Sequence, residues 1–361
     1  MGGEQMRVLF DGYWWRSGPL ANRTVQREFV LAWARAFPDD EIVVAVRGAD
    51  RPADLPSSMA MVSTRLWPHA LSNRLELARH ASRVRADAVI SHNYAPRRAS
   101  GARSVVFIHD VMFAEHPEWF SRKERVYFAP MLPWSAAADA VATSTRTEAD
   151  RIRRHGPAAP APIAVTGLAP PATLTGAGRR PPDVPEAQEF AITVGRLNVR
   201  KNLAAVLRAA GASGRITARS PLYVVGGTAH SGRGPGLGEE LEALRAAGRV
   251  VFLGPISDDE LTWMYAHAAL TISLSLDEGF GMPAVEAALH GSALVVSDIA
   301  VFRETVGEYA RFVDPLAEAG VIAEVIDAEW GRRPGIAARR AVIDEFTWER
   351  AADVLRSAAT R

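Results

Sequence analysis

The chain has 361 residues, of which 48% are hydrophobic, with a formal net charge of +1 and no cysteine. This length accommodates two domains of ordinary size, and the near-zero net charge argues against nucleic acid as a partner. The lack of cysteine excludes disulfides, thiol catalysis and cysteine-based metal sites.

The hydropathy pattern predicts no transmembrane helix, because no stretch of 18 or more apolar residues occurs. Residues 1–7 are polar and lead directly into an apolar run, so we do not expect a signal peptide. We therefore expect a cytoplasmic protein, and peripheral contact with the inner face of the membrane stays open.

Short apolar runs alternate with longer helical patterns through the first part of the chain. The runs predicted as strands are 7–10, 42–47, 88–91, 104–109, 140–143 and 163–166. The segments predicted as helices are 21–36, 72–84, 122–138 and 146–155. This alternation is typical of a parallel α/β domain.

The pattern breaks at residues 168–189, which are rich in proline and have no periodic apolar face. We interpret this stretch as an inter-domain linker, and an irregular loop within one domain is the alternative. The alternation then restarts. The later predicted strands are 190–194, 222–225, 249–253, 270–276 and 294–297, and the later helices are 202–212, 237–247, 258–268, 284–290 and 348–358.

The stretch EGFGMPAVE, residues 278–286, is the most informative motif. A buried strand is predicted before it, and a helix opened by Pro283 is predicted after it. Glu278 then lies at a strand tip, and Glu286 about a turn into the helix. Gly279 and Gly281 let backbone N–H groups approach a ligand, and a helix N-terminus favours phosphate. The motif therefore fits a hydroxyl-rich ligand that carries phosphates.

This Glu-x7-Glu motif, with Gly-Phe-Gly-Met-Pro inside it, resembles the signature of the retaining glycosyltransferases of family 4, which have the GT-B fold. The resemblance implies two Rossmann-like, doubly wound α/β domains that face a central cleft. It implies that Glu278 holds hydroxyls of the donor sugar and that Glu286 accepts hydrogen bonds from the ribose. It also assigns donor binding to Phe280, Gly281, Met282 and Pro283.

The resemblance also divides the chain. We expect an acceptor-side domain at 1–167, the linker at 168–189 and a donor-binding domain at 190–345. The terminal stretch 346–361 looks like the GT-B helix that crosses back to the N-terminal domain.

A basic segment, residues 195–202, follows the first predicted strand of the second domain. Two cations at a helix start oppose the helix dipole unless an anion lies between them, and Arg and Lys both suit a diphosphate. The segment resembles the Gly-Arg…Lys-Asn clamp of the family. The resemblance assigns donor binding to Gly195 and stabilisation of the leaving diphosphate to Arg196 and Lys201.

Glycines at two further strand ends line the crevice where ligands bind in such sheets. Gly226 ends the predicted strand 222–225, and a plain turn is the alternative there. Gly254 and Pro255 look like the base-binding loop of the family.

Two further sites are predicted in the first domain. His109, followed by Asp110, ends a predicted strand, and a histidine there in similar enzymes lies near donor sugar and acceptor. We expect it to form hydrogen bonds rather than act as the base. In the loop before the first helix, Trp14, Trp15 and Gly18 are acceptor-side candidates, as is Asp110. The two tryptophans are chosen because aromatic rings stack on sugars. Packing of both tryptophans at the inter-domain face is the alternative.

No metal site is predicted, because the chain contains no Asp-x-Asp motif to hold a divalent cation beside a diphosphate. Arg196, Lys201 and the helix dipole would neutralise the leaving group instead. We expect no cofactor, and a nucleotide-diphosphate sugar, with GDP or another base, as co-substrate.

These observations predict a retaining, metal-independent hexosyltransferase of bacterial glycan or glycoconjugate biosynthesis that acts on an unknown hydroxyl acceptor. The stretch HDVMFAEHPEWF resembles mannosyl- and rhamnosyltransferases, which favours a mannose-like sugar or a deoxyhexose. A nucleotide-sugar epimerase of similar fold and a non-catalytic nucleotide-sugar-binding protein are the alternatives. A dinucleotide-dependent enzyme is disfavoured, because no Gly-x-Gly-x-x-Gly follows the first strand.

Overall fold

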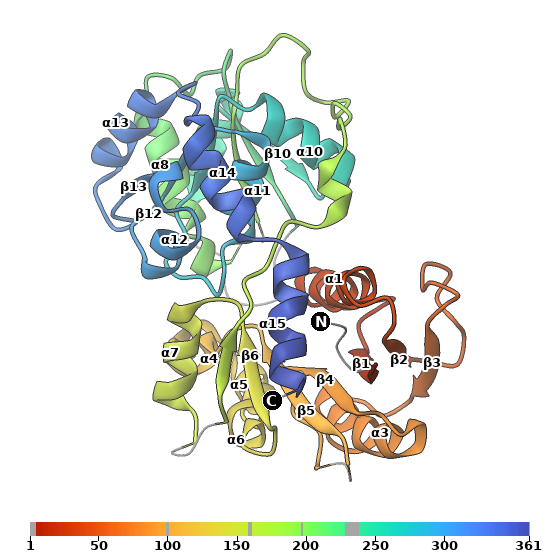
Figure 1. The fold of residues 1–361 in the computed structure, drawn as a ribbon. Coiled ribbons are helices and arrows are strands. Elements are labelled where there is room, and N and C mark those ends of the chain that lie inside the picture. The colour runs from red at the N-terminus through yellow and green to blue at the C-terminus, as the bar shows by residue number, and fades with distance from the viewer. Residues whose placement is uncertain (1–4, 99–100, 158–160, 196–197, 228–237, 361) are drawn as a thin grey trace. The chain divides into compact units, whose positions relative to one another are not determined.

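The computed structural model describes residues 5–98, 101–157, 161–195, 198–227 and 238–360. The chain divides into two compact units (Figure 1). The N-terminal unit comprises residues 1–117, 122–168 and 346–361, and the C-terminal unit comprises residues 118–121 and 169–345. Each unit is built on a parallel sheet, which confirms the predicted α/β class.

The sheet of the N-terminal unit has seven parallel strands in the order β3-β2-β1-β4-β5-β6-β7. Their bounds are β1 (Arg7–Gly12), β2 (Glu41–Arg47), β3 (Ala60–Thr64), β4 (Ala88–His92), β5 (Arg103–Ile108), β6 (Ala140–Thr143) and β7 (Ile163–Val165). The central strands are buried on both faces, as parallel strands covered by helices should be. Strand β3 was not predicted, because as a half-exposed edge strand it lacks a continuous apolar run.

Helices cover both faces of this sheet. They are α1 (Leu20–Ala36), α2 (His69–Leu71), the π-helical turn η1 (Ser72–Leu77), α3 (Ala78–Val84), α4 (Met112–Glu115), the 3₁₀ turn η2 (Pro117–Trp119), α5 (Arg122–Phe128), α6 (Met131–Ser135) and α7 (Arg146–His155). The single helix predicted for 122–138 is wrong. Pro130 separates α5 from α6, because proline removes a helical N–H and clashes with the preceding turn.

The last helix, α15 (Trp348–Thr360), belongs to the N-terminal unit and lies beside α1 (Figure 1). The Trp348 ring meets Phe29 edge to face at 5.4 Å. Arg356 Nε donates to Asp40 Oδ2 at 3.1 Å. An apolar stripe and a partly buried ion pair therefore hold the end of the chain against the unit in which the chain begins.

The sheet of the C-terminal unit has six parallel strands in the order β10-β9-β8-β11-β12-β13. The strands are β8 (Ala191–Val194), β9 (Leu222–Val225), β10 (Val250–Gly254), β11 (Leu270–Ser273), β12 (Leu294–Ser297) and β13 (Arg311–Val313). The helices are η3 (Ala172–Thr175), η4 (Val199–Lys201), α8 (Leu203–Ala212), α9 (Gly238–Ala246), α10 (Asp258–His267), α11 (Met282–His290), α12 (Ala300–Thr305), η5 (Gly307–Tyr309), α13 (Ala319–Glu329) and α14 (Ile336–Glu345).

Residues 169–189, predicted as a linker, instead pack with the C-terminal unit. Leu174 and Val184 are buried. Thr173 Oγ1 donates to Asp258 Oδ2 at 2.6 Å, at the start of α10. The proline-rich composition correctly indicates irregular backbone, but it does not show that two apolar side chains anchor this stretch.

Both sheets reverse their strand order at one point. In the N-terminal sheet the reversal lies between β1 and β4, and in the C-terminal sheet between β8 and β11. The carboxyl ends of the two strands that flank such a point are where open α/β sheets bind ligands. The candidate residues are therefore described from these two positions.

Candidate functional site

The carboxyl ends of β8, β9 and β10 each carry a glycine, and these glycines lie close together. Gly195 (φ 147°), Gly226 (φ 134°) and Gly254 (φ 70°) all adopt positive φ, which favours glycine. Gly226 N donates to Gly254 O at 2.9 Å, and a Cβ atom on Gly226 would lie only 2.0 Å from Gly195 O. Pro255 follows and is exposed. This edge of the sheet therefore presents backbone rather than side chains.

Lys201 and Glu278 form an ion pair where the strand order reverses. Lys201 Nζ donates to Glu278 Oε1 at 2.5 Å, and Ser275 Oγ donates to the same oxygen at 2.7 Å. The aliphatic part of Lys201 passes over Gly195, since a Cβ atom there would lie 3.1 Å from Lys201 Cε. The loops after β8 and β11 are joined by Leu276 N, which donates to the backbone oxygen of Arg200 at 2.8 Å.

The electrostatics of this pair keep Glu278 ionised. Burial tends to raise the pKa of Glu278, but the charges of Lys201 and Arg200 outweigh it and hold the pKa below its ordinary value. A buried carboxylate and a largely buried ammonium thus meet at the position where a ligand is expected.

The loop after Glu278 leads directly into α11. Phe280 is buried, whereas Met282 and Pro283 are partly exposed. Gly281 caps the helix with φ 85°, and a Cβ atom there would lie 2.5 Å from Phe302 Cε1. The second glycine of the motif is therefore required for both the turn and the packing.

Glu286 lies in the second turn of α11 and is buried. Tyr265 donates its hydroxyl to Glu286 Oε2 at 2.8 Å, and its ring stacks on His290. Burial raises the pKa of Glu286 to about 7, although the Tyr265 hydroxyl and the charge of Lys201 oppose the shift. The pKa values of the two glutamates of the motif are therefore shifted in opposite directions. Arg196, the other predicted cation, lies outside the described residues.

In the N-terminal unit, His109 and Asp110 directly follow β5 and are partly exposed. His109 Nε2 lies 3.3 Å from His92 Nδ1, and Asp110 Oδ1 accepts from Met112 N at 3.3 Å. Burial, followed by the charge of Asp110, raises the pKa of Glu148 to about 8, although Arg151 opposes the shift.

The prediction that Trp15 contacts an acceptor is wrong, because its side chain is only 1% exposed and its Nε1 donates to Asp54 Oδ1 at 3.1 Å. Trp14 is partly exposed, and its ring packs edge to face against Tyr13 at 4.8 Å. Gly18 has φ 126°, and a Cβ atom there would lie 2.1 Å from Trp14 Cε3. Gly18 therefore makes room for the Trp14 ring.

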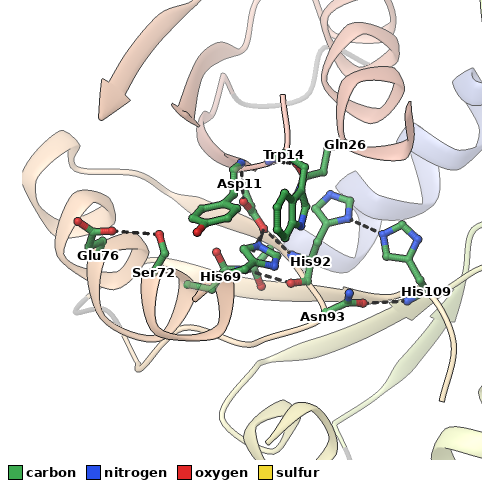
Figure 2. A network of polar contacts seen from close by, with 12 residues as sticks. Asp11, Trp14, Gln26, His69, Ser72, Glu76, His92, Asn93 and His109 are labelled. Carbon is green, nitrogen blue, oxygen red and sulfur yellow. Dashed lines mark hydrogen bonds and ion pairs between the residues drawn. The ribbon is translucent and has the colours of Figure 1, made fainter. Parts of the chain in front are cut away.

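A network centred on Asp11 lies at the reversal point of this sheet and was not predicted (Figure 2). Asp11 Oδ2 accepts from His69 Nε2 at 2.8 Å, from Asn73 Nδ2 at 2.8 Å and from the His92 backbone N at 3.2 Å. Burial tends to raise the pKa of Asp11, but His69, His92 and Asn73 lower it to about 2.

One signal in the sequence could have found part of this network. His92 is the last residue of β4 and Asp11 the next-to-last residue of β1, so the strand-end argument that selected His109 applies to them as well. His69 begins the short helix α2, which follows the unpredicted strand β3, and only the tertiary fold brings it to Asp11.

A hollow of about 530 Å³ lies elsewhere on the N-terminal unit. Its lining includes Asp39, Glu41, Met59 and Ala60, at the amino ends of β2 and β3. Because ligand crevices form at the carboxyl ends of parallel strands, we assign the site to the reversal point and not to this hollow.

Within the described ranges, no group of three or more His, Cys, Asp or Glu side chains could hold a metal ion. Among the helices that the structure describes, none is both long and apolar enough to cross a membrane.

The chain matches two family models. Residues 26–167 match Glycosyltransferase Family 4, and residues 177–329 match Glycosyl transferases group 1. It is 32% identical to the D-inositol 3-phosphate glycosyltransferase of Rhodococcus jostii (strain RHA1) over 243 residues, 61% of this chain and 52% of that relative. It is 29% identical to the O-antigen chain mannosyltransferase B of Escherichia coli over 167 residues, 45% of this chain and 43% of that relative. The matched regions span about half the length of these relatives.

Solved structures show the same fold over nearly the whole chain. Sucrose-phosphate synthase from Thermosynechococcus elongatus superposes with a TM-score of 0.72 at 17% identity, covering 98% of both chains. Anabaena HepE, solved in complex with UDP-glucose, gives a TM-score of 0.64 at 17% identity, covering 98% of this chain and 100% of that chain. The chain belongs to glycosyltransferase family 4 and has the GT-B fold, which confirms the predicted family and fold class.

Proposed function

We propose that this protein is a retaining, metal-independent glycosyltransferase that moves a hexose from a nucleotide-diphosphate sugar to a hydroxyl acceptor. The observation that carries the proposal is the Lys201–Glu278 ion pair at the reversal point of the C-terminal sheet. A cation for phosphate and a buried, ionised carboxylate for hydroxyls meet there, next to strand ends that expose backbone.

The donor site would use groups that follow three strands, β8, β9 and β11. Lys201, the backbone at Gly195 and Gly226, and the start of α11 suit the diphosphate, since helix N-termini and ammonium groups both bind phosphate. Glu286 would accept hydrogen bonds from the ribose. Its Oε2 already accepts from Tyr265, so we expect Oε1 to face the nucleotide.

The acceptor proton would pass to an oxygen of the departing phosphate on the same face of the sugar, with retention at the anomeric carbon. As the bond to the diphosphate breaks, Lys201 and Arg196 would balance the developing negative charge. This requires no metal ion and no cofactor. Glu278 would hold sugar hydroxyls and orient the anomeric carbon toward the acceptor.

The comparisons support the substrate class. One relative is a glycosyltransferase named for D-inositol 3-phosphate and another is a mannosyltransferase, and the latter favours a mannose-like sugar. HepE, of the same fold, binds UDP-glucose. The donor base and the acceptor stay open.

The test is transfer by the purified chain from a panel of UDP-, GDP- and dTDP-sugars to hydroxyl acceptors, with the anomeric configuration of the product read by NMR. Product with the donor's configuration supports the proposal, and inversion contradicts the retaining mechanism. Conversion of the donor sugar without an acceptor indicates an epimerase. Nucleotide binding without any turnover indicates a binding protein.

A further inference from the structure

Two imidazoles stand at the ends of neighbouring strands in the N-terminal sheet. His92 ends β4, His109 directly follows β5, and these strands pair in parallel with His92 opposite Phe107. Figure 2 shows the two rings reaching toward each other, with His92 Nδ1 3.3 Å from His109 Nε2. His92 is buried, whereas His109 is partly exposed.

Both rings are neutral near pH 7. Burial lowers the pKa of His92 to about 4 and holds the pKa of His109 well below its ordinary value. A neutral imidazole carries one proton, on one of its two nitrogens. A hydrogen bond between two such rings therefore has two possible arrangements, which differ in which ring donates.

In the first arrangement His109 Nε2 donates, so the proton of His92 sits on Nε2. That nitrogen is buried and has no hydrogen-bond partner among the described residues. Its ring lies against Phe29 and Phe107, at centroid distances of 5.9 and 5.6 Å, and these rings carry no hydrogen-bonding oxygen or nitrogen. This arrangement buries an unpaired N–H group.

In the second arrangement His92 Nδ1 donates to His109 Nε2, and only a lone pair of His92 Nε2 stays unpaired. Unpaired buried N–H groups are rarer in proteins than unpaired acceptors, which indicates a higher cost. The second arrangement is therefore favoured. It leaves the proton of His109 on Nδ1, which is not among the buried unpaired atoms and has no hydrogen-bond partner in the described part of the chain.

We propose that His92 is a positioning residue that fixes His109 as its Nδ1–H tautomer, so that His109 donates a hydrogen bond from Nδ1 to an oxygen of the bound sugar substrate. A protonated Nδ1 cannot take the proton of an attacking hydroxyl, so His109 is a hydrogen-bond donor and not a general base. The hydrogen bond from His109 to a substrate oxygen rests on the proposed function, whereas the assignment of the His109 tautomer does not.

The Asp11 network holds His92 in this position. Asp11 Oδ2 accepts from the His92 backbone N at 3.2 Å, and Asn73 Nδ2 donates to the His92 backbone O at 3.0 Å. The next residue, Asn93, has φ 62° and accepts from His109 N through its Oδ1 at 3.3 Å. Both partners of the imidazole contact are thus fixed through their backbones as well.

The first test measures the tautomers directly, in the full-length protein without substrate. Two-bond ¹H–¹⁵N correlation of histidine-labelled protein at neutral pH separates protonated from unprotonated ring nitrogens, and single variants assign His92 and His109 among the nine histidines. We expect both rings to carry the proton on Nδ1. A proton on His109 Nε2 would overturn the proposal, whatever the protein catalyses.

The second test uses amides as stand-ins for single ring nitrogens. The amide of asparagine reaches about as far as Nδ1 of histidine, and that of glutamine about as far as Nε2. We expect His109→Asn to keep transfer within about tenfold of the parent and His109→Gln to lose on the order of a hundredfold, as expected for one hydrogen bond in the transition state. The opposite ranking, with both variants folded, would contradict donation from Nδ1.

The third test changes only the positioning residue. His92→Asn keeps a donor near the position of Nδ1, whereas His92→Phe removes it at similar bulk. Thermal melting checks that both variants fold. We expect His92→Asn to preserve the His109 tautomer and turnover, and His92→Phe to mix the His109 tautomers and lower kcat by roughly tenfold. An unchanged His109 tautomer in folded His92→Phe would refute the positioning role.

A parent protein that shows no transfer activity would instead count against the proposed function, and the NMR assignment of the tautomers would still hold.

Discussion

The two units place different chemistry at equivalent positions of their sheets. In the C-terminal sheet, the ends of β8, β9 and β10 are glycine, and the Lys201–Glu278 ion pair lies at the reversal point between β8 and β11. At the reversal point of the N-terminal sheet, Asp11, His92 and His109 fill the strand ends with polar side chains. A backbone surface with one cation suits a bulky dianionic group, whereas a packed polar network suits fixed donors aimed at single oxygens.

The carboxylates repeat this contrast. Each unit has a buried carboxylate whose pKa is lowered, Glu278 or Asp11, and another whose pKa is raised, to about 7 for Glu286 and about 8 for Glu148. Carboxylates whose pKa values are shifted in opposite directions are typical of sites in which similar groups have different roles. In the C-terminal unit both members come from one motif. In the N-terminal unit Asp11 and Glu148 come from distant segments, and Asp11 serves mainly to hold other residues in place.

The largest effect is expected at Glu278. Glu278→Ala removes the carboxylate that would hold the sugar and should abolish transfer while the unit stays folded. Turnover and melting temperature are measured together, with Glu242→Ala as the control, since Glu242 lies on the surface of α9 and pairs with Arg245. Near-normal turnover in a folded Glu278→Ala variant would refute the donor site.

The largest effect on stability is expected at Asp11. Asp11→Ala leaves His69, Asn73 and two backbone N–H groups without their acceptor. Removal of one partner from such a buried network should lower the free energy of unfolding by about 3–5 kcal/mol. Urea denaturation measures the loss, and Asp150→Ala is the control, because Asp150 forms an exposed ion pair on α7. A loss no larger than the control's would mean that the network contributes little.

The next largest effect on turnover is expected at Lys201, the cation of the proposed donor site. Lys201→Ala should lower turnover by on the order of a hundredfold, the usual loss for one preorganised electrostatic contact. Lys201→Arg should rescue only in part, because a planar fork differs from a point charge. Arg196→Ala is expected to behave like Lys201→Ala, and Arg245→Ala serves as the neutral control. If the Lys201 and Arg196 alanine variants both retain turnover within a few-fold, the diphosphate binds elsewhere.

A smaller effect concerns Glu286 and pH. Its folded-state pKa of about 7 lies above that of an unfolded glutamate, so its contribution to stability is fully present below about pH 4.5 and is lost as the pH rises through 7. Glu286→Gln should therefore gain stability relative to the parent as the pH rises across this range, by about 3 kcal/mol, since each unit of pKa shift corresponds to about 1.4 kcal/mol. Denaturation of both proteins at pH 4.5, 6 and 8 tests this. A difference that does not change with pH would show that the Glu286 carboxyl titrates normally.

The smallest expected effect is that of metal removal. The donor site offers Lys201, Arg196 and the start of α11 to balance the diphosphate, and the chain contains no Asp-x-Asp motif. Transfer should therefore change less than twofold after exhaustive dialysis against EDTA, and added magnesium or manganese should have little effect. Full loss on chelation, restored by one of these ions, would contradict the metal-free mechanism.

Local patterns predicted much of the fold. The strands at 140–143, 222–225 and 294–297 and the helix at 146–155 agree with the structure to the residue. These segments combine a buried apolar run or an amphipathic stripe with clear boundaries. The edge strands β3 and β13 were missed, because a short, partly exposed strand has little apolar periodicity.

The sequence by itself determined the family and the motif of the proposed donor site, because Gly195, Lys201, Glu278 and Glu286 lie in two short segments whose spacing carries the signal. Only the tertiary structure decided that Trp15 is buried, and that Asp11, His69 and His92 meet. His69 lies 58 residues from Asp11, and His92 lies 81 residues from it. No local pattern spans such separations. The parallel pairing of β1 with β4 brings Asp11 and His92 to one edge of the sheet, and α2 places His69 against Asp11.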